Sequence, residues 1–184
     1  SRGGWWTKER QQRAYSVLRD KAKLSDAGAR ALVSRWANVE SVQGPKSKNP
    51  KSGAFGIHQG LGSRKPTSSD FEDQLDHVVA ELNGSEKRAG DMLRRAATFE
   101  AGAIGASAFE RAEGYSPATK RDNFVNATLR GMPHVATAAP SVGGLLASFF
   151  GTSANADEMP QGLGAEEDYF GSKPITTWGP QREE

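Results

Sequence analysis

Residues 25–45 read SDAGARALVSRWANVESVQGP, and this stretch decides the fold of the front half of the chain. Ser25 is a favourable N-cap, and the apolar residues that follow it recur at helical spacing. The pair Gly44-Pro45 prevents the helix from continuing. The stretch therefore predicts an apolar helix with Glu40 at its far end. Its apolar positions are Ala29, Leu32, Val33, Trp36 and Ala37.

Helical patterns recur on both sides of this stretch, with one irregular region between them. Thr7 can cap a helix before it, and Ser69 or Asp70 can cap a helix after it. Residues 44–65 are rich in Gly, Pro, Ser, Asn and Lys around one short apolar group, which predicts a loop with a small hairpin or turn. The further helices are predicted over residues 8–21, 71–82, 86–97, 101–112 and 117–129.

The helical pattern stops near Gly131, and the remaining sequence is dominated by Pro, Ala, Gly, Ser and Thr. We therefore expect a mainly α domain over residues 1–130, with a small hairpin or loop lobe, and an irregular tail over residues 131–184. The domain is expected to stay folded without the tail. Aromatic residues in the tail suit contact with another surface. They are Phe149, Phe150, Tyr169, Phe170 and Trp178.

The residue types exclude several classes of site. The chain has no cysteine, so disulfides and thiolate metal sites are impossible. The histidines His58, His77 and His134 lie far apart, with no helical or hairpin partner at ligand spacing, so we expect no metal and no cofactor. The longest apolar stretch, residues 142–150, is much shorter than the roughly 20 residues of a transmembrane helix, so no membrane span is expected.

The net charge of +2 conceals a strong gradient along the chain. Residues 1–65 carry 14 Lys and Arg against 4 Asp and Glu, whereas residues 131–184 carry 2 against 7. A basic front half favours contact with an anionic polymer. Nucleic acid, a lipid surface and bacterial cell wall all fit this description, and charge alone does not separate them.

Glu40 is the residue of this chain best placed for acid catalysis. A carboxyl group against apolar neighbours is desolvated, which disfavours its charged form and favours proton donation. Cleavage of a glycosidic bond needs such a donor, because the leaving oxygen must be protonated while positive charge develops on the sugar carbon. Taken alone, however, a glutamate at a helix end is more typical of a solvated surface residue.

Two segments of sequence around Glu40 favour the catalytic interpretation. Asn38-Val39-Glu40-Ser41, followed by Gly53-Ala54-Phe55-Gly56-Ile57-His58-Gln59, closely resembles the Glu-Ser and Gly-Ala-Tyr-Gly-Ile-x-Gln pair of phage tail-tip lysozymes. It resembles goose-type lysozymes and lytic transglycosylases more loosely. Phe109-Glu110-Arg111-Ala112 is similar to the closing Phe-Glu-Arg-Pro of the tail-tip family. The resemblance covers roughly residues 12–116 in the family's order, and it implies an α+β lysozyme-like fold with a hairpin lobe beside an active-site groove.

The resemblance implies a role for each matching residue. Glu40 would be the general acid, and Ser41 would help to hold the sugar or the carboxylate. Phe55, Gly56 and Gln59 would line the substrate groove. A turn with two glycines suits this role, because it lets the backbone approach a glycan closely.

A second catalytic carboxylate is not evident from the spacing. Retaining and inverting hydrolases need one about 5–10 Å from the first. The candidates near matching segments are Asp70, Asp73 and Glu110, each more typical of a helix cap or a solvated charge. Without one, a group of the substrate or a bound water could complete the reaction, so hydrolase and lytic transglycosylase both stay open.

The sequence departs from the family's pattern at two positions. Gly60 stands where the family usually has tryptophan, so a stacking platform is missing or comes from Trp5, Trp6 or Trp36. Ala112 stands in place of the proline, which should affect only a helix end. Neither departure touches the acid.

The resemblance also implies a biological setting, a phage virion protein that opens the host cell wall locally during genome entry. Its substrate would be peptidoglycan glycan strands in the host periplasm or cell wall, and residues 131–184 would contact other virion proteins. Two alternatives stay open. One is an inactive lysozyme-like structural virion protein that binds glycan or assembles the tail. The other is a basic helical nucleic-acid-binding domain, which would leave Glu40 and the glycine-rich turn unexplained, so nucleic acid is not the expected partner.

Overall fold

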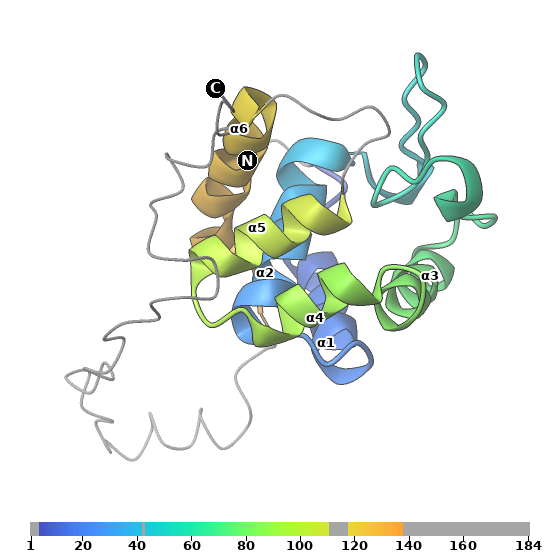
Figure 1. Cartoon of the computed structure of the whole chain (residues 1–184). Coiled ribbons are helices and arrows are strands. Elements are labelled where there is room, and N and C mark those ends of the chain that lie inside the picture. Colours follow the sequence, from blue (N-terminus) through green and yellow to red (C-terminus); the bar gives the residue numbers. More distant parts are fainter. Residues whose placement is uncertain (1–3, 42, 111–117, 138–184) are drawn as a thin grey trace, which may run out of the picture.

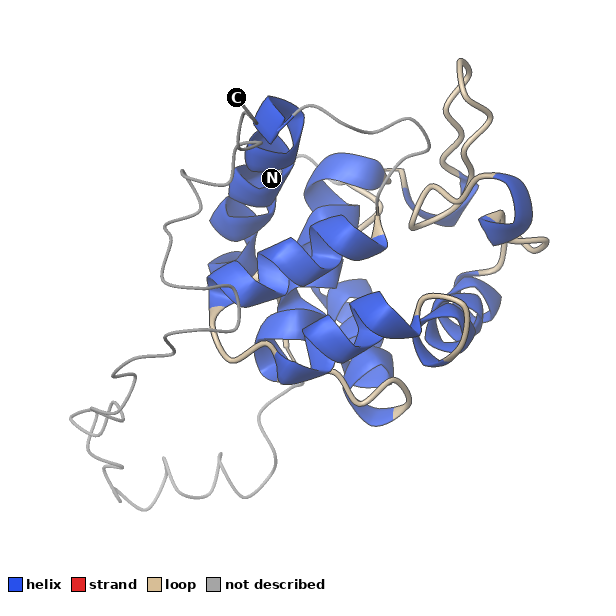
Figure 2. Cartoon of the chain, in the orientation of Figure 1, coloured by secondary structure: helices blue, strands red, loops and turns tan. Residues whose placement is uncertain are grey.

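α2 (Asp26–Arg35) is the central helix, and α1, α4, α5 and α6 pack against it (Figure 1). The computed structural model describes residues 4–41, 43–110 and 118–137. Within these ranges the chain is helical without a strand, so the predicted mainly α fold is confirmed (Figure 2). None of the described helices combines the length and apolar character that crossing a membrane requires. The remaining elements are α1 (Lys8–Asp20), η1 (Trp36–Glu40), η2 (Gly44–Lys46), η3 (Gly62–Arg64), α3 (Phe71–Asn83), α4 (Lys87–Arg95), α5 (Phe99–Phe109), α6 (Ala118–Gly131) and η4 (Met132–His134).

α2 can occupy the centre because its residues are mostly small or apolar. The Ser25 side chain caps the helix by accepting a hydrogen bond from the backbone N–H of Gly28. Gly28 also allows α4 to approach, because a Cβ at this position would lie only 2.1 Å from the carbonyl oxygen of Leu93. The close approach buries almost the whole of α2, and the core continues into Trp36 at the start of η1, whereas Glu40 at the end of η1 is partly exposed.

An aromatic cluster covers the junction of α2 and η1. Trp6 stacks on Trp36 with ring centroids 6.2 Å apart, and Phe71 packs edge-on against Trp6 at 5.7 Å. The indole N–H of Trp6 donates a hydrogen bond to the carbonyl of Ser41 at 2.8 Å. Trp6 and Trp36 are both buried. These two rings therefore belong to the core, and they do not offer a stacking platform to a ligand.

Ion pairs with α3 neutralise part of the basic excess of the front half. Basic residues of the front half pair with acidic residues of α3, which lies beside α1. Such pairing lowers the local excess of positive charge that the sequence alone suggests. The pairs are Arg13–Glu72 at 2.8 Å, Lys21–Asp76 at 3.0 Å and Arg64–Glu81 at 2.7 Å.

The packed domain extends past the boundary predicted at residue 130. Met132 in η4 is fully buried, Val135 is nearly so, and η4 packs against α2. The backbone N–H of Ala136 donates to the side-chain oxygen of Gln11 at 3.0 Å. Residues 131–136 therefore belong to the domain, because Met132 and Val135 complete its core. The tail predicted beyond them lies, from residue 138 on, outside the described residues.

Candidate active site

Glu40 lies at the end of η1, a single π-helical turn that continues α2. The backbone N–H of Ser41 donates to the carbonyl of Trp36, five residues earlier, at 3.0 Å. This last turn is wider than the α-helical turn that the apolar spacing predicts. Single π-turns are frequent at functional sites.

The wide turn brings Glu40 onto Arg35. The two side chains form an ion pair with 2.8 Å between Nε and Oε1, and the Arg35 side chain is 3% exposed against 19% for Glu40. The Arg35 guanidinium also lies over the ring of Phe124, 4.7 Å from its centroid. Glu40 is therefore a partly exposed carboxylate held by a buried cation. Sequence analysis missed Arg35, because residues five apart are not neighbours on a regular α-helix.

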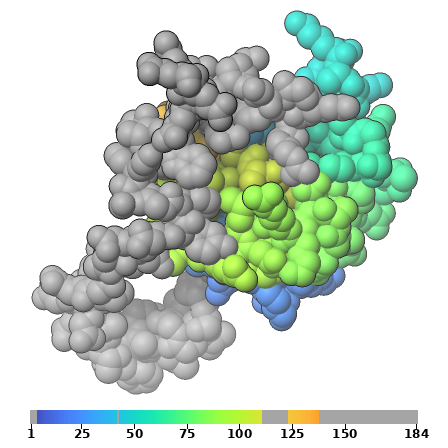
Figure 3. All heavy atoms as spheres, in the orientation of Figure 1, coloured from blue at the N-terminus to red at the C-terminus, as the bar shows by residue number. Residues whose placement is uncertain are grey.

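A cavity of about 480 Å³ opens beside Glu40. Gln43, Gln59 and the loop of residues 47–51 line it, and Glu40 is its one acidic residue within the described part of the chain. The loop, cyan in Figure 3, projects from the helical body. Two of its side chains are the basic residues Lys48 and Lys51, so the rim of the cavity carries positive charge.

The turn over residues 54–60 pairs with the loop of residues 47–51 that lines the cavity. Phe55 and Gly60 exchange two backbone hydrogen bonds, of 3.1 and 3.0 Å, and Lys48 forms a second antiparallel bridge with Phe55. Among the described residues this region is thus a turn with two isolated bridges and no strand, which fits the predicted loop or turn and not a hairpin of two strands. A Cβ at Gly60 would lie 2.2 Å from the carbonyl oxygen of Arg64, so the tryptophan that the resembled family carries here has no room.

Gln59 faces the same cavity as Glu40. Its backbone has a positive φ of 53°, and its side-chain amide donates to the carbonyls of Ser47 at 3.0 Å and Gly56 at 2.9 Å. These bonds fix the amide at the edge of the groove. The structure therefore brings Glu40 and Gln59, from two separate segments, to one site.

Ser41, Gly56 and Gln74 join the turn to the helices. The Ser41 hydroxyl is buried and donates to the carbonyl of Ile57 at 2.6 Å, so it positions the turn instead of facing the cavity. The buried amide of Gln74 accepts from the Ile57 N–H and donates to the carbonyl of Pro45, each at 2.8 Å. Gly56 has a φ of +88°, and a Cβ there would lie 2.8 Å from Gln74 Oε1. Sequence analysis did not assign Gln74 this role, because its partners are distant backbone groups.

Glu110, which directly follows α5, has a buried carboxyl group that lies against Trp36 of η1. It accepts a hydrogen bond from the indole N–H of Trp36 at 2.6 Å. Burial raises the pKa of Glu110 well above its ordinary value, and the negative charge of Glu40 raises it further. The Trp36 hydrogen bond and the charges of Arg35 and Arg64 oppose this shift without cancelling it.

The other two candidates for a second carboxylate lie at the start of α3. Asp70 caps that helix by accepting a hydrogen bond from the backbone N–H of Asp73 at 3.1 Å. The Asp73 carboxylate accepts from the hydroxyl of Ser68 at 2.7 Å. Both aspartates are exposed and neither lines the cavity. Glu110, the third candidate, is buried and does not line the groove.

Comparisons with protein-family models, with curated proteins and with solved structures found no match. The chemical groups that this chain offers at the cavity are a partly exposed carboxylate, Glu40, an anchored amide, Gln59, and a basic rim.

We expect the substitution Glu110→Gln to change how stability depends on pH. Because the folded-state pKa of Glu110 is raised, its contribution to stability is complete below the unfolded pKa of about 4.3 and is lost as pH rises through the folded pKa. Glutamine keeps an acceptor oxygen for Trp36 but does not ionise. Urea denaturation between pH 4 and 9 should show the wild type losing stability relative to the variant as pH rises. A difference that is constant with pH would contradict the raised pKa.

Proposed function

We propose that this protein cleaves the glycan strands of peptidoglycan, with Glu40 as the general acid. The observation that carries the proposal is the shared cavity, because Glu40 and Gln59 line it from two segments. These are the two segments whose sequences resemble phage tail-tip lysozymes. A partly exposed carboxylate beside an amide and two lysines suits an anionic, hydroxyl-rich polymer.

In the proposed reaction, the Glu40 carboxyl group gives its proton to the bridging oxygen of a glycosidic bond. The bond between this oxygen and the sugar carbon breaks, and positive charge develops on the carbon. A hydroxyl group then adds to the carbon and returns its proton to the Glu40 carboxylate. The ion pair with Arg35 must loosen whenever Glu40 carries the proton, so Arg35 is a positioning residue that holds the carboxylate between these steps.

The proposed source of the attacking hydroxyl is the substrate itself. Hydrolases of the two-carboxylate type place a second carboxylate about 5–10 Å from the first. No second acidic residue lines the cavity within the described residues, and Glu110 is buried against Trp36. We therefore favour a lytic transglycosylase, in which a sugar hydroxyl closes an anhydro ring, over a muramidase.

Digestion of purified Gram-negative peptidoglycan by the full chain tests this function, with the products identified by mass spectrometry. Anhydromuropeptides are the expected products. Muropeptides with reducing ends would identify a hydrolase and would overturn the preference for attack by the sugar. No products at any enzyme concentration would overturn the proposal of cleavage.

The Arg35–Glu40 ion pair favours one second candidate, an inactive lysozyme-like virion protein that binds glycan. A carboxylate already paired with a buried cation holds no proton to donate in that state. Such a protein would sediment with insoluble peptidoglycan without releasing products.

The setting in a phage virion, with residues 131–184 contacting other virion proteins, is proposed from the resemblance alone. The paired charges of α1 and α3 weigh against the nucleic-acid alternative.

Replacing Lys48 and Lys51 together by glutamine should weaken substrate binding more than it slows the chemical step. Both lysines line the cavity, and no ion pair within the described residues involves either. We expect KM to rise about 2–10-fold, with a smaller change in kcat and a flatter dependence on salt. Lys87→Gln, on α4 and away from the cavity, is the matched control. An unchanged KM in the double variant would show that the rim does not attract the polymer.

A further inference from the structure

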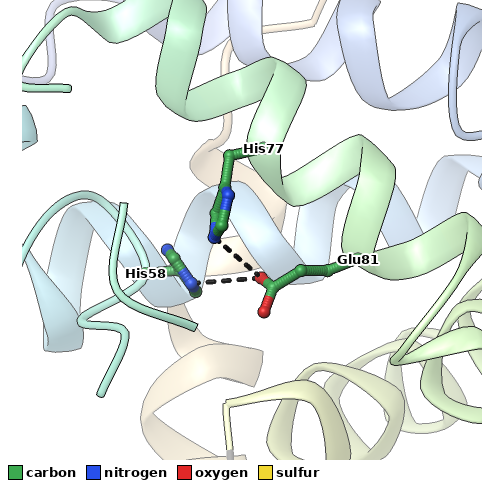
Figure 4. Close-up of side chains that lie close together, drawn as sticks. All are labelled: His58, His77 and Glu81. Carbon is green, nitrogen blue, oxygen red and sulfur yellow. Dashed lines mark ion pairs between the residues drawn. The ribbon is translucent and has the colours of Figure 1, made fainter. Parts of the chain in front are cut away.

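We propose that His58, His77 and Glu81 form a binding site for a divalent transition-metal ion such as Zn²⁺. His58 lies in the turn over residues 54–60, and His77 and Glu81 lie one helical turn apart on α3. Figure 4 shows the three side chains pointing toward one another. The sequence predicted no metal because the histidines lie far apart along the chain, and folding brings two of them together.

The distances between the ligand atoms suit a small cation. His58 Nε2 lies 3.1 Å from Glu81 Oε2, and His77 Nε2 lies 3.8 Å from the same oxygen. One ligand atom from each of the three residues lies within 4.8 Å of the others. Zinc bonds of about 2.0–2.2 Å place the ligand atoms of a tetrahedral site about 3.3–3.6 Å apart. The separations of 3.1 and 3.8 Å therefore bracket the spacing that the ligand atoms of a zinc site require.

Three atoms of this cluster are buried and make no hydrogen bond of good geometry, although two of them, His58 Nε2 and Glu81 Oε2, face each other at 3.1 Å. They are both ring nitrogens of His58 and the Oε2 atom of Glu81, as judged within the described residues. His58 is 3% exposed and Glu81 is 6% exposed, so neither side chain has free access to water. Buried polar atoms nearly always have a partner. A cation between His58 and Glu81 would satisfy one nitrogen and the oxygen together.

The surroundings of Glu81 suit a ligating carboxylate. Its Oε1 atom accepts a 2.7 Å hydrogen bond from Arg64, which leaves Oε2 directed at the histidines. Arg64 also lies 3.7 Å from Glu86. The two carboxylates and this one guanidinium together carry one net negative charge beside the histidines when the histidines are neutral. That charge favours a cation.

Gly60 keeps the backbone close to the cluster. A Cβ at this position would lie 2.2 Å from the Arg64 carbonyl oxygen and 2.9 Å from His58 Nε2. The same carbonyl oxygen lies 3.0 Å from His77 Nε2, which makes it a candidate fourth ligand atom beside the two histidine nitrogens and the Glu81 oxygen. Metal binding must replace this contact between His77 and the carbonyl, because a ligating nitrogen offers its lone pair.

A metal ion at this position would link the 54–60 turn to α3. The turn also carries Gln59, which follows His58 directly and faces the groove. The ligand atoms of His58 and Glu81 are buried, whereas the His77 side chain is 30% exposed. We therefore assign the ion a structural role, holding the turn in place, and no step of glycan cleavage passes through it.

Titration of the full chain with ZnCl₂ after chelator treatment tests the site. The wild type is expected to bind one zinc ion, with Tm rising by roughly 5–15 °C at about 100 times the Kd. His77→Ala removes the ligand whose side chain is 30% exposed, and it should weaken zinc binding by at least about 10–100-fold. His134→Ala, an exposed histidine on η4, is the matched control and should bind zinc as the wild type does.

Co²⁺ provides a second readout that does not depend on stability. The wild type should show the visible absorption of tetrahedral Co²⁺, and His77→Ala should lose it. Equal metal affinity in the wild type and His77→Ala, or no binding by either, would overturn the proposal. These measurements contain no peptidoglycan, and Glu40→Gln should bind zinc normally. Failure of the metal site and failure of the proposed glycan cleavage can therefore be told apart.

Discussion

Glu40→Gln should lower the rate of peptidoglycan cleavage by about 10²–10⁴-fold, the usual contribution of a general acid. Glutamine keeps the size of the side chain and an oxygen that can accept from Arg35, but it has no proton to donate to a leaving oxygen. Because the substitution is nearly isosteric, substrate binding should change little. Release of soluble muropeptides, followed over time at equal protein concentration, measures the effect.

Asp73→Asn is the matched control for this experiment. Asp73 is exposed and accepts from Ser68, an interaction that asparagine can retain. We expect wild-type activity from this variant, whereas a loss comparable to that of Glu40→Gln would make Asp73 the second catalytic carboxylate. Equal activity in Glu40→Gln and the wild type would remove Glu40 from the mechanism. Circular dichroism and Tm measurements must show that each variant is folded.

Ending the chain at residue 130 should cost far more stability than ending it at residue 137. The shorter chain lacks two residues of the core, Met132, which is fully buried, and Val135, which is 7% exposed. Truncation of a buried methionine side chain alone typically costs about 2–5 kcal/mol. That is a large share of the roughly 5–15 kcal/mol by which a domain is stable. Urea denaturation of the two truncated chains and the full chain measures the difference.

Met132→Ala in the full chain separates the loss of this side chain from the loss of the backbone. It should reproduce a large part of the destabilisation of the chain that ends at residue 130. Met92→Ala is a control of the same residue type at a partly exposed position on α4. Equal stability of the chains ending at 130 and 137 would restore the boundary predicted from the sequence.

The helical part of the structure was largely predictable from local patterns. Thr7, Ser25 and Asp70 cap helices as their positions suggest, and each accepts a hydrogen bond from a backbone N–H in the first turn. The helix predicted over residues 86–97 is α4, which spans Lys87–Arg95 and follows Glu86, a residue that provides no side-chain cap. The apolar pattern therefore located α4 correctly, but it did not define the residues at which the helix begins and ends.

The candidate site was only partly predictable. Glu40 and Gln59 were placed at one groove by resemblance, and the structure brings both to the same cavity. Ser41 was expected near the sugar, yet its hydroxyl is buried against the carbonyl of Ile57. Arg35 was missed, because only a π-turn lets it reach Glu40. A one-residue change in helical register is too small to alter the apolar pattern that sequence analysis uses.

By itself, the sequence determined approximately where the helices lie, because caps and apolar spacing act over a few residues. Only the tertiary structure decided that Glu110 is buried beside Trp36, and that His58 meets Glu81 across two elements. Burial and contact between distant segments depend on how the helices pack, and that packing leaves no local signature in the chain. The chemical environment of each carboxylate was therefore settled by packing, although its position in the chain was known from the start.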